Sequence, residues 1–266
     1  MSTPLAVRAV LVRRNLLFLA GLAVVGVLTV GSSLVTEFSF SAGIASVPKA
    51  FVWMARNFIP NARAMKALPS IGIKLAETVL VSIMATVLAG GVSLILAILA
   101  SRTTRPHPSV SAVVRLVASV CRNIPVVAWA MIFLLSFGQN VLTGLLSLFI
   151  GTVGYLTRAY AEAIDETAES SVEALRASGA SWLQTVAQAV LPALMPQLTS
   201  WMLYMVETNI RDATLVGILT GTGIGFLFDI YYKSLNYPSA ALVVIGVIIV
   251  VIAIETASNA LRKVIL

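Results

Sequence analysis

Residues 173–192 read Glu-Ala-Leu-Arg-Ala-Ser-Gly-Ala-Ser-Trp-Leu-Gln-Thr-Val-Ala-Gln-Ala-Val-Leu-Pro and form a polar stretch between two apolar ones. Helix-forming residues predominate from Glu162 onward, and no proline interrupts them before Pro192. Gly179 lies where a helix would need a C-cap or a tight corner. The stretch therefore predicts a helix, a turn at Gly179 and a second helix.

The helix before this turn is expected to carry an acidic face. Four glutamates recur at intervals of four, three and four residues, as neighbours on one side of a helix do, and Asp165 lies beside them. They are Glu162, Glu166, Glu169 and Glu173. We expect this face to meet water or a protein partner, because charged groups are costly in lipid.

The composition is that of a membrane protein, since 59% of the 266 residues are hydrophobic and 11% are charged. The net charge of +7 comes from cations at the edges of apolar segments, which indicates membrane anchoring rather than nucleic-acid binding. One cysteine, Cys121, and one histidine, His107, give no basis for a disulfide or a metal site. No Gly-x-x-x-x-Gly-Lys-Ser/Thr motif occurs, so we expect no catalytic residues for nucleotide hydrolysis.

We predict an all-α integral membrane fold with six transmembrane helices, each near the ~20 apolar residues that span a bilayer. The third helix should kink at Pro125, because proline removes a backbone hydrogen bond. Residues 36–74 mix prolines, aromatic residues and cations, which favours short amphipathic helices at the membrane surface. The predicted spans cover residues 16–35, 78–100, about 115–137, 141–160, 191–210 and 240–254.

A glycine-rich segment precedes the last predicted helix. Residues 215–228 are apolar, but they fall short of the ~17 residues that a spanning helix needs. We predict a re-entrant or broken segment here, which is tolerated at membrane depth only where protein or a cavity covers it. Its glycines are Gly217, Gly221, Gly223 and Gly225.

The spacing of Glu173-Ala174, Gly179 and Leu191-Pro192 resembles the cytoplasmic EAA loop of ATP-binding-cassette (ABC) importer permeases. The pattern of that family is Glu-Ala-Ala, three residues, Gly, nine residues, Ile, one residue and Leu-Pro. This chain departs from it with Leu in place of the second Ala and Ala in place of the Ile. The resemblance implies a coupling helix pair that docks on a separate ATPase subunit through the five matching residues. The alternative is an ordinary connector between two spans.

The resemblance also divides the chain. Residues 1–74 are expected to form an N-terminal transmembrane helix with an external or interfacial segment. Residues 75–266 are expected to form the permease core, with the EAA-like loop at about residues 162–192.

A polar cluster near the end of the fifth predicted span is the candidate substrate path. The run from Glu207 to Arg211, followed by Thr-Gly-Thr-Gly-Ile-Gly, resembles the C-terminal part of phosphonate-type ABC permeases, although Thr222 replaces an Ala and one glycine is missing. Alternatively, Glu207 and Arg211 simply pair on one helix face. The candidate path residues are Glu207, Asn209, Arg211, Thr214, Gly217, Gly221, Gly223 and Gly225.

Arg211 is the expected anion-binding group of this path, because a guanidinium is always charged and its fork of donors matches an oxyanion. The glycines would let backbone N–H groups approach the path, and a broken helix would add the positive end of its dipole. The run Arg122-Asn-Ile-Pro125 resembles an Arg-x-x-Pro found in many importer permeases.

These resemblances imply the permease subunit of an ATP-driven importer for phosphonate, phosphate or a related phosphorus oxyanion. The expected partners are ABC ATPase subunits that bind the ATP, an extracytoplasmic substrate-binding protein, and a second permease copy or a homologous permease. No cofactor or nucleic acid is expected. The expected location is the bacterial inner membrane, crossed several times, with both termini in the cytoplasm.

Three alternatives remain from the sequence. Permeases for methionine or another small polar solute share the glycine segment, although they usually have five spans and lack the arginine. An ion-coupled secondary carrier would often show inverted repeats, and none is visible. A purely structural membrane subunit would lose no transport when the polar cluster is changed.

Overall fold

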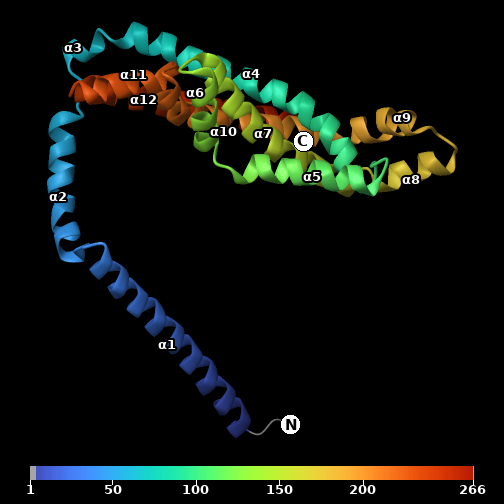
Figure 1. Ribbon diagram of the computed structural model, residues 1–266, viewed down its shortest axis with the longest axis horizontal. Helices are drawn as coiled ribbons and strands as arrows, with labels where there is room; N and C mark the ends of the chain where they lie inside the picture. Colours follow the sequence, from blue (N-terminus) through green and yellow to red (C-terminus); the bar gives the residue numbers. More distant parts are fainter. Residues whose placement is uncertain (1–3, 266) are drawn as a thin grey trace. The chain divides into compact units, whose positions relative to one another are not determined.

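The computed structural model describes residues 4–265, and every regular element in that range is a helix (Figure 1). Contacts between Cα atoms divide the chain into two units, residues 1–57 and residues 58–266. The predicted boundary at residue 74 therefore differs from the division by contacts. Residues 58–74 belong with the core because Ala64 and Ile71 pack in one buried cluster with Ile224, Leu242 and Val243.

The described part of the first unit, residues 4–57, contains two helices. Helix α1, Pro4–Val35, includes an apolar stretch long enough to cross a membrane, as predicted for residues 16–35. Helix α2, Phe40–Asn57, is amphipathic, contains Pro48 and has no buried residue. Its amphipathic sequence is therefore that expected of a helix at the membrane surface.

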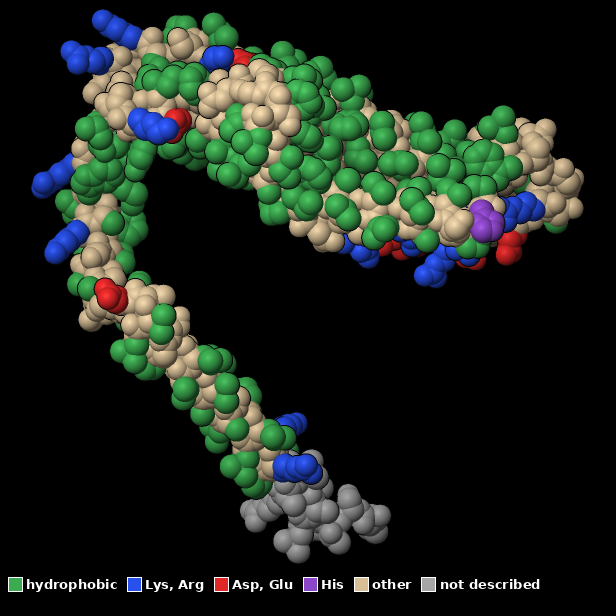
Figure 2. All heavy atoms as spheres, viewed as in Figure 1, with side chains coloured by type: hydrophobic (Ala, Val, Ile, Leu, Met, Phe, Trp, Pro, Cys, Tyr) green, Lys and Arg blue, Asp and Glu red, His purple; other side chains and the backbone are tan. Residues whose placement is uncertain are grey.

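The second unit is a bundle of long apolar helices joined by short ones. Figure 2 shows hydrophobic side chains over most of its visible face and charged side chains gathered near His107. Its elements are α3 (Ala62–Met65), α4 (Leu68–Ala100), α5 (Pro108–Asn123), α6 (Val126–Phe137), α7 (Val141–Thr167), α8 (Glu169–Ala177), α9 (Trp182–Thr185), the π-helical η1 (Val186–Val190), α10 (Leu191–Thr220), α11 (Gly223–Lys233) and α12 (Tyr237–Ile265).

Helices α4, α7 and α10 are joined at the centre of the core by a polar cluster. The Asn209 side chain of α10 is buried, and its Nδ2 donates to Thr86 Oγ1 of α4 and to Thr152 Oγ1 of α7, at 2.8 Å each. Ser82 Oγ of α4 donates to the Asn209 carbonyl at 3.2 Å. Interhelical hydrogen bonds of this kind hold membrane helices together where lipid offers no partner.

The described residues include five helices long and apolar enough to span a membrane, or six if α5 and α6 form one broken span. The kink predicted at Pro125 is confirmed, but it is a bend of 92° between two separate helices. Proline disfavours the helical conformation in the residue before it, and Ile124 is accordingly extended, with φ −88° and ψ 123°.

The break predicted in the glycine segment is confirmed, but several helices extend beyond the predicted spans, α12 for example to Ile265. Helix α4 begins ten residues before the predicted Thr78, and α10 continues ten residues past the predicted Ile210, to Thr220. Residues 215–228 are broken, as predicted, and they are shared between two helices. Their first part completes α10, their last part belongs to α11, and the break is confined to Gly221 and Thr222. Gly221 ends α10 in the left-handed conformation, with φ 70°, which glycine adopts without strain.

The helix, turn and helix predicted around Gly179 are confirmed. Helix α8 ends at Ala177, Gly179 has φ 85°, and Ser181 caps α9 through a capping box with Gln184. The chain then enters α10 through η1, in which Leu191 N–H donates to the Val186 carbonyl. This wider turn precedes Pro192, which has no N–H to donate and crowds the preceding turn of a regular helix.

Candidate functional site

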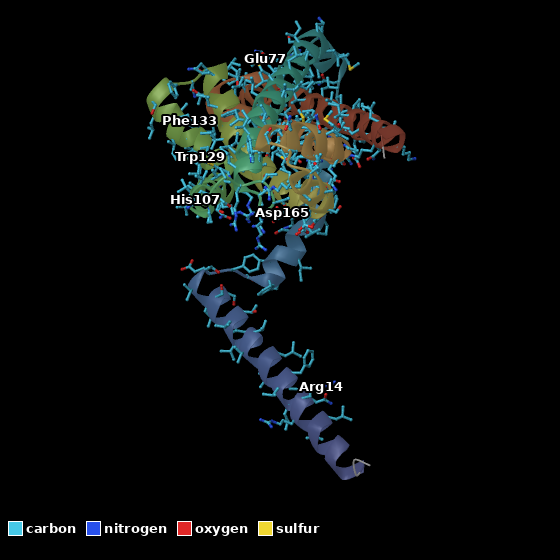
Figure 3. The ribbon with its side chains drawn as sticks, turned by 90° about the vertical axis from the view of Figure 1, so that its right-hand side faces the viewer. Arg14, Glu77, His107, Trp129, Phe133 and Asp165 are labelled. Atoms are coloured by element: carbon cyan, nitrogen blue, oxygen red, sulfur yellow. The ribbon has the colours of Figure 1, made fainter. Side chains whose placement is uncertain are left out.

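The expected site residues lie in two regions of the core. Figure 3 shows Glu77 of α4 toward one end of the core and Asp165 of α7 toward the other, near His107. The EAA-like loop follows α7 at the Asp165 end. The Gly221 turn lies at the opposite end of α7, beside the turn between α6 and α7, because Gln139 Nε2 donates to the Leu219 carbonyl at 3.1 Å.

The corner of the EAA-like loop is exposed. Glu173, Ala174, Gly179 and Pro192 are exposed and Leu191 is half-buried. A Cβ placed on Gly179 would meet no atom within 4 Å, so the corner projects into open space. Glu173, Ala174 and Gly179 therefore lie on the accessible helix pair α8–α9, whereas Leu191 and Pro192 begin α10, where Leu191 packs against the core.

This helix pair is braced by the loop between α4 and α5, a contact that the sequence did not reveal. Arg176 Nη2 of α8 donates to the Thr103 carbonyl at 2.8 Å. Trp182 Nε1 of α9 donates to the Thr104 carbonyl at 2.8 Å. The two bonds therefore hold both sides of the Gly179 corner to one loop of the core.

Asp165 belongs to the same brace, which corrects part of the acidic-face prediction. It accepts hydrogen bonds from Ser101 Oγ at 2.5 Å and from Thr103 N–H at 3.1 Å, and it lies 3.6 Å from Arg115 Nη2. The predicted exposure is confirmed for the four glutamates, Glu162, Glu166, Glu169 and Glu173. Asp165 instead ties α7 to the α4–α5 loop.

The polar cluster on α10 separates into a surface pair and a buried amide. Arg211 Nη1 and Glu207 Oε1 lie 2.7 Å apart, so the pairing considered from the sequence is formed. The Arg211 side chain is 46% exposed and that of Glu207 is 13% exposed. Asn209, by contrast, is buried and hydrogen-bonded to Thr86 of α4 and Thr152 of α7.

The glycines allow close packing of helices. A Cβ on Gly225 would overlap the Thr214 carbonyl oxygen of α10, and one on Gly217 would lie 2.5 Å from the Thr222 carbonyl oxygen. A Cβ on Gly223 would lie 2.5 Å from Thr78 Oγ1. Gly217, Gly223 and Gly225 therefore let α11 pack directly against α10 and α4.

The expectation that a helix dipole would be free to face an anion was wrong for α11. Its first N–H groups are occupied by α4, since Gly223 N–H donates to Glu77 Oε1 at 3.2 Å and Ile224 N–H donates to Thr78 Oγ1 at 2.9 Å. Glu77 also pairs with Lys74 at 2.6 Å. Glu77 thus supplies the negative charge that the start of a helix attracts.

The described fold and its exposed helix pair are those of a membrane permease subunit. Residues 91–265 match the family described as binding-protein-dependent transport system inner membrane component, and this chain belongs to that family.

Two named relatives support the assignment. The chain is 33% identical over 196 residues to the phosphate-import permease protein PhnE of Mycolicibacterium smegmatis. The aligned residues cover 74% of this chain and 37% of PhnE. It is 34% identical over 189 residues to the phosphite transport system permease protein PtxC of Stutzerimonas stutzeri. The aligned residues cover 71% of this chain and 69% of PtxC. This chain thus matches little more than a third of the length of PhnE.

Solved structures share the fold at lower sequence identity. A chain of an inward-facing methionine ABC transporter superposes with a TM-score of 0.66 at 18% identity, covering 77% of this chain and 99% of that chain. A chain of an amino acid ABC transporter gives a TM-score of 0.64 at 14% identity, covering 75% of this chain and 95% of that chain. These likenesses show the ABC permease fold.

Proposed function

We propose that this chain forms half of a membrane pathway through which an ABC importer carries a phosphorus oxyanion, such as phosphite, phosphate or a phosphonate, into the cell. The observation that carries the substrate class is Arg211, a half-exposed guanidinium on α10, in a chain whose relatives are named phosphate and phosphite permeases. A guanidinium fork matches an oxyanion in both charge and geometry. A methionine-type solute is the second candidate, supported by the fold alone.

The proposed partners follow from the absence of a nucleotide-binding motif and from the exposed helix pair. ATP is bound and hydrolysed by separate ATPase subunits that dock on Glu173, Ala174, Gly179, Leu191 and Pro192, and this chain holds no cofactor. A binding protein outside the membrane delivers the substrate. A second copy of this chain, or a homologous permease, completes the pathway.

Ligand-stimulated ATP hydrolysis tests the substrate class. The permease would be reconstituted with its ATPase subunit and binding protein, and hydrolysis measured with phosphite, phosphate, methylphosphonate, sulfate or methionine. We expect a phosphorus oxyanion to give the largest stimulation. Stimulation by methionine without any response to phosphorus oxyanions would reject the proposed substrate class.

Replacing Arg211 should slow transport of the anion. Because the site must release its ligand, Arg211 is expected to bind it transiently. Arg211→Ala should lower uptake about tenfold, which corresponds to ~1.4 kcal/mol, and should leave docking of the binding protein intact. Arg211→Lys should recover only part of the uptake, since lysine lacks the fork. If Glu207→Ala in the Arg211→Ala background restores full uptake, the two residues are only an ion pair.

Thiol labelling tests the proposed topology, in which the EAA-like loop and both ends of the chain lie on the cytoplasmic side. After Cys121→Ala removes the native thiol, Ser170→Cys on the exposed face of α8 should resist an impermeant reagent in intact cells and react in inverted vesicles. Ser39→Cys, in the stretch predicted to lie outside, should behave in the reverse manner. If Ser170→Cys reacts in intact cells and Ser39→Cys reacts only in inverted vesicles, the topology is the reverse of the one proposed.

A further inference from the structure

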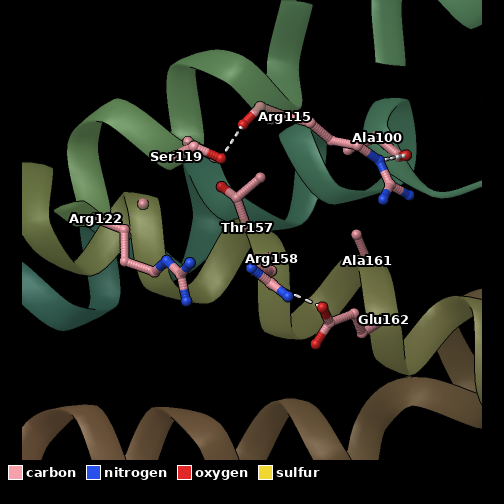
Figure 4. A pocket seen from close by; sticks show the side chains of 10 residues that line it. Ala100, Arg115, Ser119, Arg122, Thr157, Arg158, Ala161 and Glu162 are labelled. Atoms are coloured by element: carbon pink, nitrogen blue, oxygen red, sulfur yellow. Dashed lines mark hydrogen bonds and ion pairs between the residues drawn. The ribbon is translucent and has the colours of Figure 1, made fainter. Parts of the chain in front are cut away.

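An arginine-lined cavity of about 230 Å³ lies between α5 and α7 (Figure 4). Arg115 and Arg122 stand seven residues apart on α5, and Arg158 and Glu162 stand four apart on α7, so each pair lies on one side of its helix. The space between them stays open because the other lining residues are small. These are Ala100, Ala118, Ser119, Gly154, Thr157 and Ala161.

Close backbone approach sets the position of Arg122. A Cβ on Gly154 would lie 2.5 Å from the Arg122 backbone nitrogen and 2.8 Å from the Ala118 carbonyl oxygen. Glycine at this position therefore lets α5 rest directly on α7. The cavity begins beside this contact and extends along α7 to Glu162, toward the end that carries the EAA-like loop.

The three arginines differ in their partners. Arg158 pairs with Glu162 at 2.7 Å. Arg115 donates Nε–H to the Ala100 carbonyl at 2.9 Å and lies 3.6 Å from Asp165. The Arg122 side chain makes no hydrogen bond or ion pair with any of the residues that the structure describes. Arg122 is therefore the guanidinium whose donors are available to a ligand.

Thr157 supplies a second group without a partner. The residue is 1% exposed, and its Oγ1 is buried with no hydrogen-bond partner among the described residues, so an anion in the cavity reaches it only after a small shift of the cavity wall. Several buried threonines in this bundle donate to the carbonyl four residues earlier, as Thr86 does to Ser82. Thr157 does not, and the carbonyl in question, that of Val153, accepts from Ser93 Oγ. A buried hydroxyl left unpaired costs roughly 1–3 kcal/mol, which a bound acceptor would offset.

We propose that this cavity is an oxyanion site for a phosphate group, with Arg122 and Thr157 as its principal ligands and Arg115 and Arg158 adding positive charge. The lining indicates an oxyanion, and the choice of phosphate among the oxyanions rests on the proposed function. Three guanidinium groups against one carboxylate in the lining disfavour a cation. A water molecule occupies about 30 Å³ of liquid, so the volume admits a phosphate group with part of its hydration shell.

Phosphate binding to the purified full-length chain tests the site without ATP, ATPase or binding protein. In a nonionic detergent, Arg122→Gln should raise the Kd for inorganic phosphate at least tenfold. The matched control is Arg105→Gln, which removes an exposed arginine from the loop before α5, outside the cavity, and should change the Kd less than twofold. An unchanged Kd in Arg122→Gln, or an equal loss in the control, would overturn the proposal.

Thr157→Val separates a ligand from a structural group. The substitution keeps the shape and removes the unpaired hydroxyl, so the melting temperature should stay the same or rise. The Kd for phosphate should rise several-fold, because the hydroxyl no longer donates to the anion. Phosphate binding as tight as that of the native chain would exclude Thr157 from the site.

The phosphate group could belong to a free solute or to a lipid, and nanodiscs distinguish the two. Phosphate binding would be compared in discs of phosphatidylcholine alone and in discs that also contain phosphatidylglycerol. Weaker binding in the anionic discs that requires Arg122 identifies a lipid head group, and equal binding identifies the free anion. If the purified chain does not bind phosphate through Arg122, the proposed transport function still stands. If phosphorus oxyanions fail to stimulate ATP hydrolysis, the measured binding of phosphate at Arg122 is unaffected.

Discussion

Gly225→Ala should prevent the core from assembling. A methyl group at this position would overlap the Thr214 carbonyl oxygen and lie 2.9 Å from the Ile218 backbone nitrogen. These are backbone atoms of α10, which cannot move aside as a flexible side chain can. Overpacking typically costs about 1–3 kcal/mol when side chains can adjust, and we expect ~3 kcal/mol or more here. Size-exclusion chromatography in detergent should show little monodisperse protein.

Gly91→Ala is the matched control, because it adds the same methyl group to a membrane helix. A Cβ on Gly91 of α4 would meet no atom within 4 Å. Alanine is the better helix former by about 1 kcal/mol, so this variant should be as stable as the native chain or slightly more stable. A normal yield and melting temperature in Gly225→Ala would show that α11 does not pack on α10 as described.

Gly179→Leu should uncouple transport from ATP hydrolysis while the chain still folds. The residue has φ 85°, which costs a non-glycine residue about 1–2 kcal/mol, and the corner has open space around it. The cost is small for the core, but the leucine side chain projects from the surface proposed to meet the ATPase. Uptake should fall at least tenfold, with membrane insertion unchanged and co-purification of the ATPase reduced.

Gly138→Leu controls for backbone strain alone. Gly138 has φ 72° and no atom within 4 Å of a placed Cβ, but it lies in the turn between α6 and α7, at the other end of α7. This variant should retain its ATPase subunit. If both variants lose the ATPase equally, strain explains the defect. If Gly179→Leu keeps both association and uptake, the EAA-like loop is not the coupling element.

The sequence predicted the parts of the fold that depend on neighbouring residues. Hydrophobic runs identified the long helices, the residue before Pro125 ended a helix, and Gly179 and Gly221 took the positive φ that ends helices at glycine. The helix ends were less predictable. Lys74–Glu77 and Glu207–Arg211 pair within α4 and α10, so charges that had indicated the ends of spans lie inside helices.

The site was predicted less completely, because its contacts join residues far apart in the chain. Glu77 and Gly223 are separated by 146 positions, and no local pattern reveals that one caps the helix of the other. The same holds for Arg176 and Thr103, 73 positions apart. The glycines in residues 215–228 were recognised, but only the packed helices show that they serve close approach between α10 and α11.

Uptake into proteoliposomes tests the central claim most directly. Vesicles would contain the permease alone or with its ATPase subunits, with binding protein and labelled phosphorus oxyanion outside and ATP inside. We predict accumulation only when permease, ATPase, binding protein and ATP are all present, and loss of accumulation when ATP is replaced by a non-hydrolysable analogue. Uptake by the permease alone, driven by an ion gradient without ATP, would contradict the assignment of this chain to an ATP-driven importer.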